Sequence, residues 1–423
     1  MTVLTGLRVI DFSEYIAGPF AGMLLGDMGA DVIKVEPPGG DRFRQGRFYA
    51  PHESRTNLPM NRSKRSIAID LTTSEGKEVV HSLTKDADVV MHNFRPGVAE
   101  RLGIDYDTLS AMNPGLVYCH NTAFGPKGPL AAKGGYDILS MASAGFLTGP
   151  AARMDGSRLY VDMGLSIADI TSAIFQALAI CAALWQRERS GVGQRIDTSL
   201  LGAGLAIQAQ RLLSVEGSDL QRRQDFLARL EQTAGSPMSF ADILELRQSA
   251  ARPWAGNFYL RTYETKDRPM AVACFNDRLR RRCAEIIGID DPRYNDSDFN
   301  QGDPDAQEQL QQIATQAETI MRTKTSSQWT SLFDAAGVPC CPVQFIEELY
   351  EDPQVLANDY VVELEHSTLG PIKMGGAPFA FDRPPLDIHR APPGLSEHAD
   401  EVLVELGYSE DEIWSLRYRK IIV

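Results

Sequence analysis

The sequence predicts an α/β protein: a large domain built on a doubly wound parallel sheet, with a smaller α+β domain. Three observations indicate this. Short apolar runs alternate with helical patterns through the first 200 residues, and the runs are not joined by hairpin signals. After Leu213 the composition turns polar and charged. The length of 423 residues is enough for one large core and a second domain.

The first expected unit is a βαβ motif over residues 7–36. Residues 7–13 (LRVIDFS) form a short apolar run typical of a buried strand. A helix is expected at 20–29, with Pro19 at its first position, where a missing N–H does no harm. Residues 30–36 (ADVIKVE) then form the second strand.

The same alternation continues to residue 124. Strands are expected at 65–71, 88–94 and 116–124, with a helix at 74–87. Because parallel strands need long crossover connections, usually helices, this order favours a doubly wound sheet.

A longer helix is expected from Ile170 onward. Its apolar positions, which recur with a period of 3.6 residues, are 170, 173, 174, 177, 178, 181, 184 and 185. Gly191 is placed to end the helix in a left-handed conformation. We expect the whole stripe to lie in the core.

The domain limits follow from the change in composition after the first domain. We expect the N-terminal part of the large domain at 1–215, a linker at 216–235, the small domain at 236–328, and a return linker with the C-terminal part of the large domain at 329–423. Strand candidates in the small domain are 257–265 and 269–275.

The composition argues against several classes of protein. A net charge of −14 is unfavourable for a nucleic-acid binder, although a local Arg cluster or a helix N-terminus could still hold a phosphate. No apolar run approaches the ~20 residues of a membrane helix, and no signal peptide is expected. We therefore expect a cytoplasmic protein without membrane or nucleic-acid partners.

Cysteine and histidine spacings do not indicate a metal site. The six cysteines form no CxxC pair and are expected to be reduced thiols. The seven histidines form no HExxH or similar ligand spacing.

Asp169 has two possible roles at the start of the long helix. Ser166-x-x-Asp169 has the spacing of a capping box, although Glu or Gln is the usual partner. A carboxylate in the first turn gains about 0.3–1 kcal/mol from the helix dipole, and the same field should keep it ionised and nucleophilic. The spacing alone does not separate a cap from a nucleophile.

Several other residues could bind phosphate. Gly18-Pro19 lies between a strand and a helix, Arg95 and Arg101 flank a Pro-Gly turn, and Lys64-Arg65 precedes a strand. A structural turn or a solvated helix face would explain each of them equally well.

Several segments, in order along the chain, resemble the family III CoA-transferase and acyl-CoA racemase superfamily. They are LTGLRVIDFSEYIAGPFAGMLLGDMGADVIKVEPPGGDRFR, NRSKRSIAIDLTTSEGKE, ADVVMHNFRPGVAERLGIDYDTLSAMNPGLVY, FGPKGP, SIADITSAIFQALAICAALWQRERSGVGQRIDTSLL and PPGLSEHADEVLVELG. Together they cover about half of the chain.

The resemblance implies a family III CoA-transferase with Asp169 as the catalytic residue. CoA would pass from an acyl-CoA donor to a carboxylic acid acceptor through an aspartyl anhydride and an aspartyl-CoA thioester. CoA thioesters are then substrates, and no cofactor is held permanently. An interlocked homodimer is also implied. The CoA-binding positions that it implies are Ile16, Ala17, Ile69, Asp70, Leu71, Thr72, Asn93, Phe94, Arg95, Arg101, Gly134, Gly135, Tyr136 and Asp137.

The sequence departs from the family pattern at two places. Pro37 stands where some members carry an Arg, so Arg42 or Arg44 could replace that adenine-side contact. Formyl-CoA transferases carry a glycine run in the small domain, whereas SAARPWAGNFYL has only Gly256. A different covering loop, and a different substrate, are expected.

Two alternatives remain open. An α-methylacyl-CoA racemase of the same superfamily uses a His in a GHD segment, but the matching segment here is Gly135-Tyr136-Asp137. Tyrosine, with a pKa of about 10, is a poor base at neutral pH. In a non-catalytic CoA-binding protein Asp169 would be only a cap. The sequence does not specify which acids are exchanged.

Overall fold

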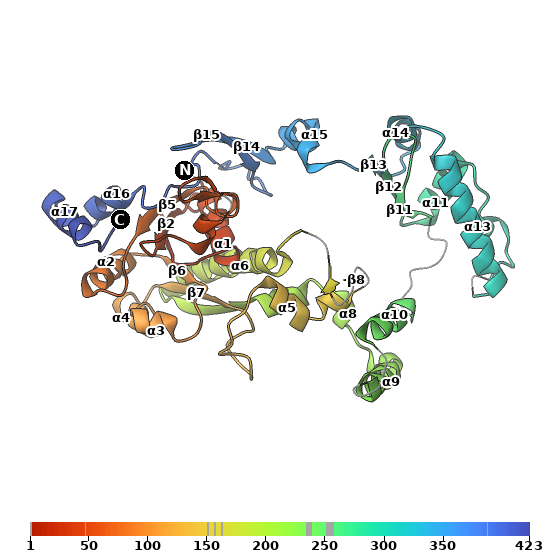
Figure 1. The fold of residues 1–423 in the computed structure, drawn as a ribbon. Helices are drawn as coiled ribbons and strands as arrows, with labels where there is room; N and C mark the ends of the chain where they lie inside the picture. The colour runs from red at the N-terminus through yellow and green to blue at the C-terminus, as the bar shows by residue number, and fades with distance from the viewer. Residues whose placement is uncertain are drawn as a thin grey trace. The chain divides into compact units, whose positions relative to one another are not determined.

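The computed structural model describes two compact units (Figure 1). The residues described are 2–46, 48–149, 152–155, 158–161, 164–233, 239–250, 258–300, 302–386 and 388–423. The large unit comprises Met1–Gln232 and Gln354–Val423, and the small unit Thr233–Pro353. The domain limits expected from the sequence stay predictions. Gly256, in the expected covering loop, lies outside the described residues.

The large unit is built on a six-stranded parallel sheet, which confirms the predicted fold class. Its strand order is β10-β7-β6-β1-β2-β5. The strands are β1 (Arg8–Asp11), β2 (Asp31–Glu36), β5 (Lys64–Ala68), β6 (Val89–His92), β7 (Val117–Thr122) and β10 (Gln194–Ser199). From β1 the chain builds outward through β2 to one edge, and from β6 through β7 to the other.

Helices cover both faces of this sheet (Figure 1). α1 (Ala17–Asp27) and α6 (Ile167–Ser190) pack on one face, where Val9 and Val32 point. The opposite face, where Ile10 and Ile33 point, is covered by α2 (Ser74–Lys85), α4 (Tyr106–Met112), α16 (Ala399–Glu405) and α17 (Glu410–Tyr418). Alternate side chains of each strand therefore enter two separate cores, as a doubly wound sheet requires.

α1 begins at Ala17, three residues before the predicted start, so that boundary was wrong. Its N-cap, Ile16, makes no side-chain hydrogen bond, and this start carries no capping signal in the sequence. Pro19 still lies in the first turn, where N–H groups lack intrahelical partners. Gly18 allows the first turn of α1 to pack closely against Ser13, which follows β1, since a Cβ at Gly18 would lie 2.1 Å from Ser13 Cβ.

α6 divides the predicted apolar stripe between two faces, which corrects the expectation that the whole stripe lies in the core. Ala173, Ala177 and Leu184 are buried against the sheet, whereas Leu178 is 64% exposed and Trp185 is 69% exposed. The small residues of α6 face the sheet and α1 because they allow the helix to pack closely. Several of its larger apolar side chains therefore lie on the exposed face. By length and composition alone α6 could cross a membrane, a test that core helices also pass.

The remaining elements of the large unit are short, apart from α9. They are η1 (Arg42–Gln45), β3 (Phe48–Ala50), β4 (Glu53–Ser54), η2 (Leu58–Met60), α3 (Val98–Leu102), α5 (Asp137–Ser143), η3 (Phe146–Thr148), β8 (Arg153–Asp155), β9 (Arg158–Tyr160), α7 (Leu200–Ala206), α8 (Ala209–Leu212), α9 (Glu216–Thr233), α15 (Pro353–Ala357), β14 (Val361–His366) and β15 (Gly370–Gly375). The segment expected as a linker at 216–235 is thus largely helical, because it is rich in Leu, Gln, Arg and Glu.

The small unit is an α+β domain, as predicted. Its antiparallel sheet has the order β11-β12-β13, and the first two strands confirm the two predicted strands. The elements are α10 (Phe240–Ala250), β11 (Leu260–Tyr263), β12 (Met270–Ala273), α11 (Asp277–Ile287), α12 (Pro292–Asn295), α13 (Pro304–Met321), α14 (Ser326–Ala335), β13 (Cys340–Pro342) and η4 (Ile346–Tyr350). Trp329, Phe333 and Tyr263 centre its core.

Candidate active site

A cavity of about 800 Å³ lies at the carboxyl ends of β1, β6 and β7 in the large unit. It lies where the strand order reverses between β1 and β6, the place at which open α/β sheets bind ligands. The wall consists of Glu14, Tyr15, Ile16, Ala17, Arg42, Phe43, Asn93, Phe94, Arg95, Pro96, Val98, Asn121, Thr122, Ala123, Lys133, Gly134, Gly135, Tyr136, Asp137, Ile138, Ser166, Asp169 and Leu200.

Asn93 joins the two turns that flank this switch point. Its Oδ1 accepts from the Glu14 backbone N–H at 2.9 Å, and its Nδ2 donates to the Glu14 carbonyl at 2.7 Å. Both ends of the amide are therefore used to hold the turn after β1 against the turn after β6. Asn93 lies in the wall, as expected, and also shapes it.

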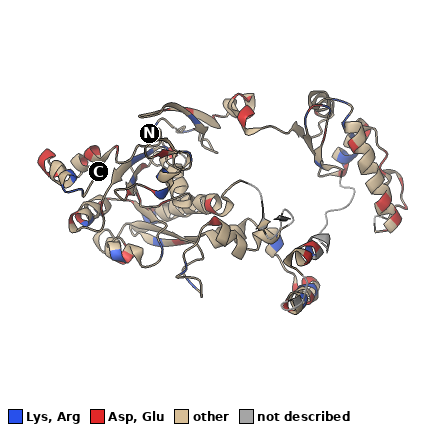
Figure 2. Cartoon of the chain, in the orientation of Figure 1, with Lys and Arg blue, Asp and Glu red and all other residues tan. Residues whose placement is uncertain are grey.

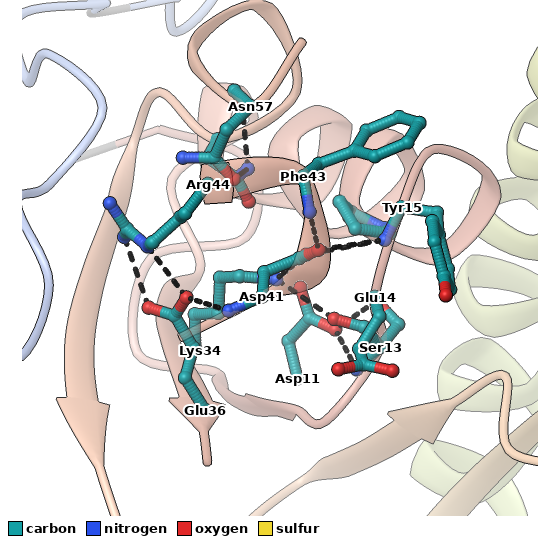
Figure 3. Close-up of polar contacts among 12 residues, drawn as sticks. Asp11, Ser13, Glu14, Tyr15, Lys34, Glu36, Asp41, Phe43, Arg44 and Asn57 are labelled. Carbon is teal, nitrogen blue, oxygen red and sulfur yellow. Dashed lines mark hydrogen bonds and ion pairs between the residues drawn. The ribbon is translucent and has the colours of Figure 1, made fainter. Parts of the chain in front are cut away.

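A buried ion pair supports the wall formed by Tyr15 and Phe43 (Figure 3). Asp41 accepts from the Phe43 backbone N–H at 2.9 Å and from the Tyr15 backbone N–H at 3.2 Å. Lys34 Nζ donates to Asp41 at 3.0 Å and to the Ser13 carbonyl at 2.8 Å. Tyr15 has a φ of 69°, so these bonds hold it in a left-handed conformation that a tyrosine rarely adopts.

Arg44 does not contact the cavity, although it was one of two candidates for an adenine-side contact. Its Nε donates to Glu36 at 2.7 Å (Figure 3). Its Nη2 donates to the Pro393 carbonyl at 3.0 Å, and the side chain is fully buried. Burial of Glu36 opposes ionisation, but the Arg44 charge outweighs it and lowers the pKa of Glu36 to about 2. Arg42, the other candidate, is exposed and lines the cavity.

Two stacked histidines hold the backbone of Phe94. His92 Nδ1 accepts from the Phe94 N–H at 3.2 Å, while His120 Nε2 donates to the Phe94 carbonyl at 3.0 Å. Tyr118 Oη donates to the Ile104 carbonyl, so His92 Nε2 must donate to Tyr118 Oη, at 2.7 Å. The ring centroids of the two histidines are 4.4 Å apart. Burial lowers the pKa of both imidazoles, which keeps them neutral.

The Gly134–Asp137 stretch is brought against the turn after β6. A Cβ at Gly134 would lie 2.3 Å from Arg95 Nε, and one at Gly135 would lie 2.7 Å from Ala123 Cβ. The two glycines therefore make room for the Arg95 side chain and for close packing of the wall. Tyr136 contributes an exposed ring whose centroid lies 5.5 Å from that of Tyr15.

Asp137, not Ser166, caps α6. Ser166 occupies the N-cap position but makes no side-chain hydrogen bond, so the capping-box interpretation was wrong. Asp137 Oδ1 instead accepts from the Asp169 backbone N–H at 3.1 Å. A carboxylate 32 residues away in the chain takes the capping role, which leaves the Asp169 side chain free for another.

The Asp169 side chain lies in the first turn of α6 and lines the cavity. Burial, together with the nearby Asp137 charge, raises the pKa of Asp169 to about 7. Burial therefore opposes the helix dipole, which was expected to keep this carboxylate ionised. No hydrogen-bond donor among the described residues reaches its carboxylate.

Three cations in the wall have no carboxylate partner in the described part of the chain. They are Arg42, Arg95 and Lys133, all of them exposed. Elsewhere in the chain basic and acidic residues are interspersed along the elements (Figure 2). Exposed cations in a cavity wall provide donors for an anionic ligand.

Five predicted CoA-binding residues do not line the cavity. Ile69 is buried in the core and bridges to Ile422, while Leu71 packs against the same core. Asp70 accepts from the Thr72 N–H and hydroxyl, which forms a local turn before α2. Arg101 is exposed on α3, and its carbonyl accepts from Lys77. The other predicted site residues are brought together in the wall.

Other wall residues were missed by the sequence reasoning. They are Glu14, Tyr15, Phe43, Pro96, Val98, Asn121, Thr122, Ala123, Lys133, Ile138, Ser166 and Leu200. One signal was available for Asn121–Ala123: they lie near the carboxyl end of the strand expected at 116–124, and the carboxyl ends of parallel strands carry ligand sites. Among the described residues no His, Cys, Asp and Glu cluster could hold a metal ion, and all six cysteines are free thiols.

Comparisons with known proteins agree with the predicted family. The sequence model of CoA-transferase family III matches residues 4–399. The chain is 35% identical to the succinate–glutarate CoA-transferase of Agrobacterium fabrum, covering 95% of both chains, and 30% identical to the succinyl-CoA:glutarate CoA-transferase of Mus musculus, covering 98% of this chain and 89% of that one. The crystal structure of a CaiB/BaiF family protein from Brucella suis is similar, with a TM-score of 0.72 at 29% identity, covering 96% and 99%. The chain belongs to CoA-transferase family III.

Proposed function

We propose that Asp169 is the nucleophile through which this CoA-transferase moves CoA from an acyl-CoA donor to a carboxylic acid acceptor. One observation carries the proposal: Asp169 lines a cavity together with Arg42, Arg95 and Lys133, and none of the four side chains has an oppositely charged or hydrogen-bonding partner among the described residues. The cations suit the phosphates of CoA, and the carboxylate suits attack on its thioester.

The first step forms an anhydride. One oxygen of ionised Asp169 attacks the thioester carbonyl, the carbon–sulfur bond breaks, and CoA leaves as the thiolate. The raised pKa of Asp169 makes its carboxylate more basic than an ordinary aspartate, and therefore a stronger nucleophile once it is ionised.

The second step forms an aspartyl-CoA thioester. The CoA thiolate attacks the Asp169 carbonyl of the anhydride, and the donor acid leaves as a carboxylate. An acceptor carboxylate then attacks the aspartyl thioester to form a new anhydride and thiolate. Attack of that thiolate on the acceptor acyl group releases the new acyl-CoA and free Asp169. The energy of the thioester is kept as long as water is excluded.

CoA would bind with its phosphates at Arg42, Arg95 and Lys133 and its thioester at Asp169. Arg42 would then provide the adenine-side contact that an Arg at the position of Pro37 could make in some family members. Residues 69–72 follow β5, two strands from β1 and thus about 10 Å along the same sheet edge. These residues and Arg101 stay predictions for the part of CoA that extends beyond the cavity.

Neither alternative activity gains support from the site. A racemase of this superfamily would pair a histidine with an aspartate, and no histidine of the described residues lines the cavity. For a protein that only binds CoA, Asp169 would be the cap of α6, but Asp137 has that role.

The active enzyme would be a homodimer. Ile174, Leu178 and Trp185 form an exposed apolar face on α6, with exposures of 50%, 64% and 69%. Contiguous apolar surface of this kind usually marks a protein interface.

The test is to trap Asp169 after mixing the enzyme with succinyl-CoA, with glutarate as the first acceptor. Hydroxylamine or borohydride should modify the Asp169 peptide, as detected by mass spectrometry. Asp169→Asn should lower the exchange rate by roughly 10³-fold or more, while CoA affinity stays within about threefold. An unmodified Asp169 peptide across a panel of acyl-CoA donors, or ordinary turnover by Asp169→Asn, would refute the proposal.

A further inference from the structure

The side-chain nitrogen of Asn121 faces the same cavity. The residue lies in β7 and is only 2% exposed, yet it is part of the cavity wall. Within the described part of the chain, no acceptor bonds to its Nδ2. That nitrogen is nevertheless not fully buried. Its N–H groups therefore open onto the cavity.

The orientation of this amide is set by hydroxyls from two other elements. Ser172 Oγ, on α6, donates to Asn121 Oδ1 at 2.9 Å, and Thr198 Oγ1, on β10, donates to the same oxygen at 3.0 Å. An amide oxygen has two lone pairs, and both are used. Because both hydroxyls donate to the oxygen, Nδ2 is placed on the cavity side before any substrate binds.

Asn121 is also close to the proposed nucleophile. Ser172 follows Asp169 by three residues on α6, so the two lie on one face of the helix with Cβ atoms about 5–6 Å apart. The hydroxyl of Ser172 bonds directly to Asn121. The amide is thus bonded to a residue one helical turn from Asp169, in a largely buried environment where a hydrogen bond to a developing charge is strong.

We infer that Asn121 is a further catalytic residue, which donates a hydrogen bond to the carbonyl oxygen of the acyl group as Asp169 attacks it. This rests on the proposed role of Asp169. When the Asp169 oxygen bonds to the carbonyl carbon, the carbonyl oxygen becomes negative. It loses that charge as the carbon–sulfur bond breaks and the CoA thiolate leaves. No proton is transferred, so a donor of fixed orientation is sufficient. Ser172 and Thr198 are positioning residues that aim it.

The test is rapid-quench measurement of Asp169 acylation by succinyl-CoA in the full-length enzyme. Asn121→Ala should slow acylation about 100-fold, the usual effect of removing one donor to an oxyanion, with little change in the KM for succinyl-CoA. Ser172→Ala should slow it less, and Ser172→Ala should have no further effect in the Asn121→Ala background, because the hydroxyl acts only through the amide. Gln176→Met, a buried position on the same helix, is the matched control and should acylate at the wild-type rate.

The outcomes separate this inference from the proposed function. If wild-type Asp169 is never acylated, the proposed nucleophile is wrong. If Asp169 is acylated in the wild type and in folded Asn121→Ala at similar rates, the nucleophile stands and the role of Asn121 is overturned. Should Asn121→Ala fail to fold, Asn121→Ser and Ser172→Ala take its place, and rates within about threefold of the wild type for both would overturn the inference equally.

Discussion

At the scale of single residues, the pKa of Asp169 links the packing of α6 to the proposed chemistry. Burial and the charge of Asp137 raise this pKa to about 7, so the nucleophile titrates near neutral pH. The same shift also makes the free energy of unfolding depend on pH. A carboxyl group whose pKa is higher in the folded than in the unfolded chain favours folding at low pH, and this contribution is lost as the pH rises through about 7.

The rate of acyl transfer should therefore rise about tenfold per pH unit below pH 7 and level off above it. Asp137→Asn should move the midpoint to lower pH, because it removes a like charge and keeps an oxygen for the Asp169 N–H. The pH dependence of kcat/KM measures both. Asp105→Asn, a change of the same type at the cap of α4 and outside the cavity wall, should leave the midpoint in place. An unshifted midpoint in Asp137→Asn would contradict the assigned cause.

At the scale of elements, neighbouring strands hold the turn that carries Phe94 and Arg95. His92 ends β6 and His120 lies in β7, and between them they use both the N–H and the carbonyl of Phe94. His120 is also faced by Asp197 of β10, 3.7 Å from its Nδ1. The turn that leads into Arg95 is thus fixed by the sheet itself.

Loss of this support should weaken CoA binding more than it affects the chemical step. His120→Ala should raise the KM for acyl-CoA about two- to tenfold, as the loss of one net hydrogen bond predicts, with kcat nearly unchanged. His120→Gln, which keeps a donor near the position of Nε2, should restore most of the affinity. Steady-state kinetics of both variants test this; a fall in kcat at constant KM would count against a positioning role.

At the scale of the whole molecule, the exposed face of α6 is the strongest sign of assembly. Leu178 and Trp185 project from a helix whose opposite face is buried against the sheet. α6 also carries Asp169 at its start. A partner covering this face would therefore stabilise the helix that holds the proposed nucleophile.

Leu178→Glu should convert the dimer into a monomer, because it would bury a charge without a partner in the interface. Light scattering coupled to size exclusion gives the mass directly. Val404→Glu, at a position 59% exposed on α16, is the matched control and should stay dimeric. A monomeric wild type, or a dimeric Leu178→Glu, would remove the assembly proposal.

The sequence by itself determined the parallel sheet, because its strands are short apolar runs separated by helical patterns and these patterns are local. β1, β2, β6 and β7 lie within the predicted ranges. The left-handed end of α6 at Gly191 and the first-turn position of Asp169 were also predictable, since both depend on residues adjacent in the chain.

The tertiary structure alone decided what depends on residues distant in the chain. Asp137 replaces Ser166 as the cap of α6, and burial raises the pKa of Asp169. Arg44 pairs with buried Glu36, and of the two arginines only Arg42 lines the cavity. Capping, burial and ion pairing across tens of residues depend on how the elements pack, and no local pattern encodes that packing.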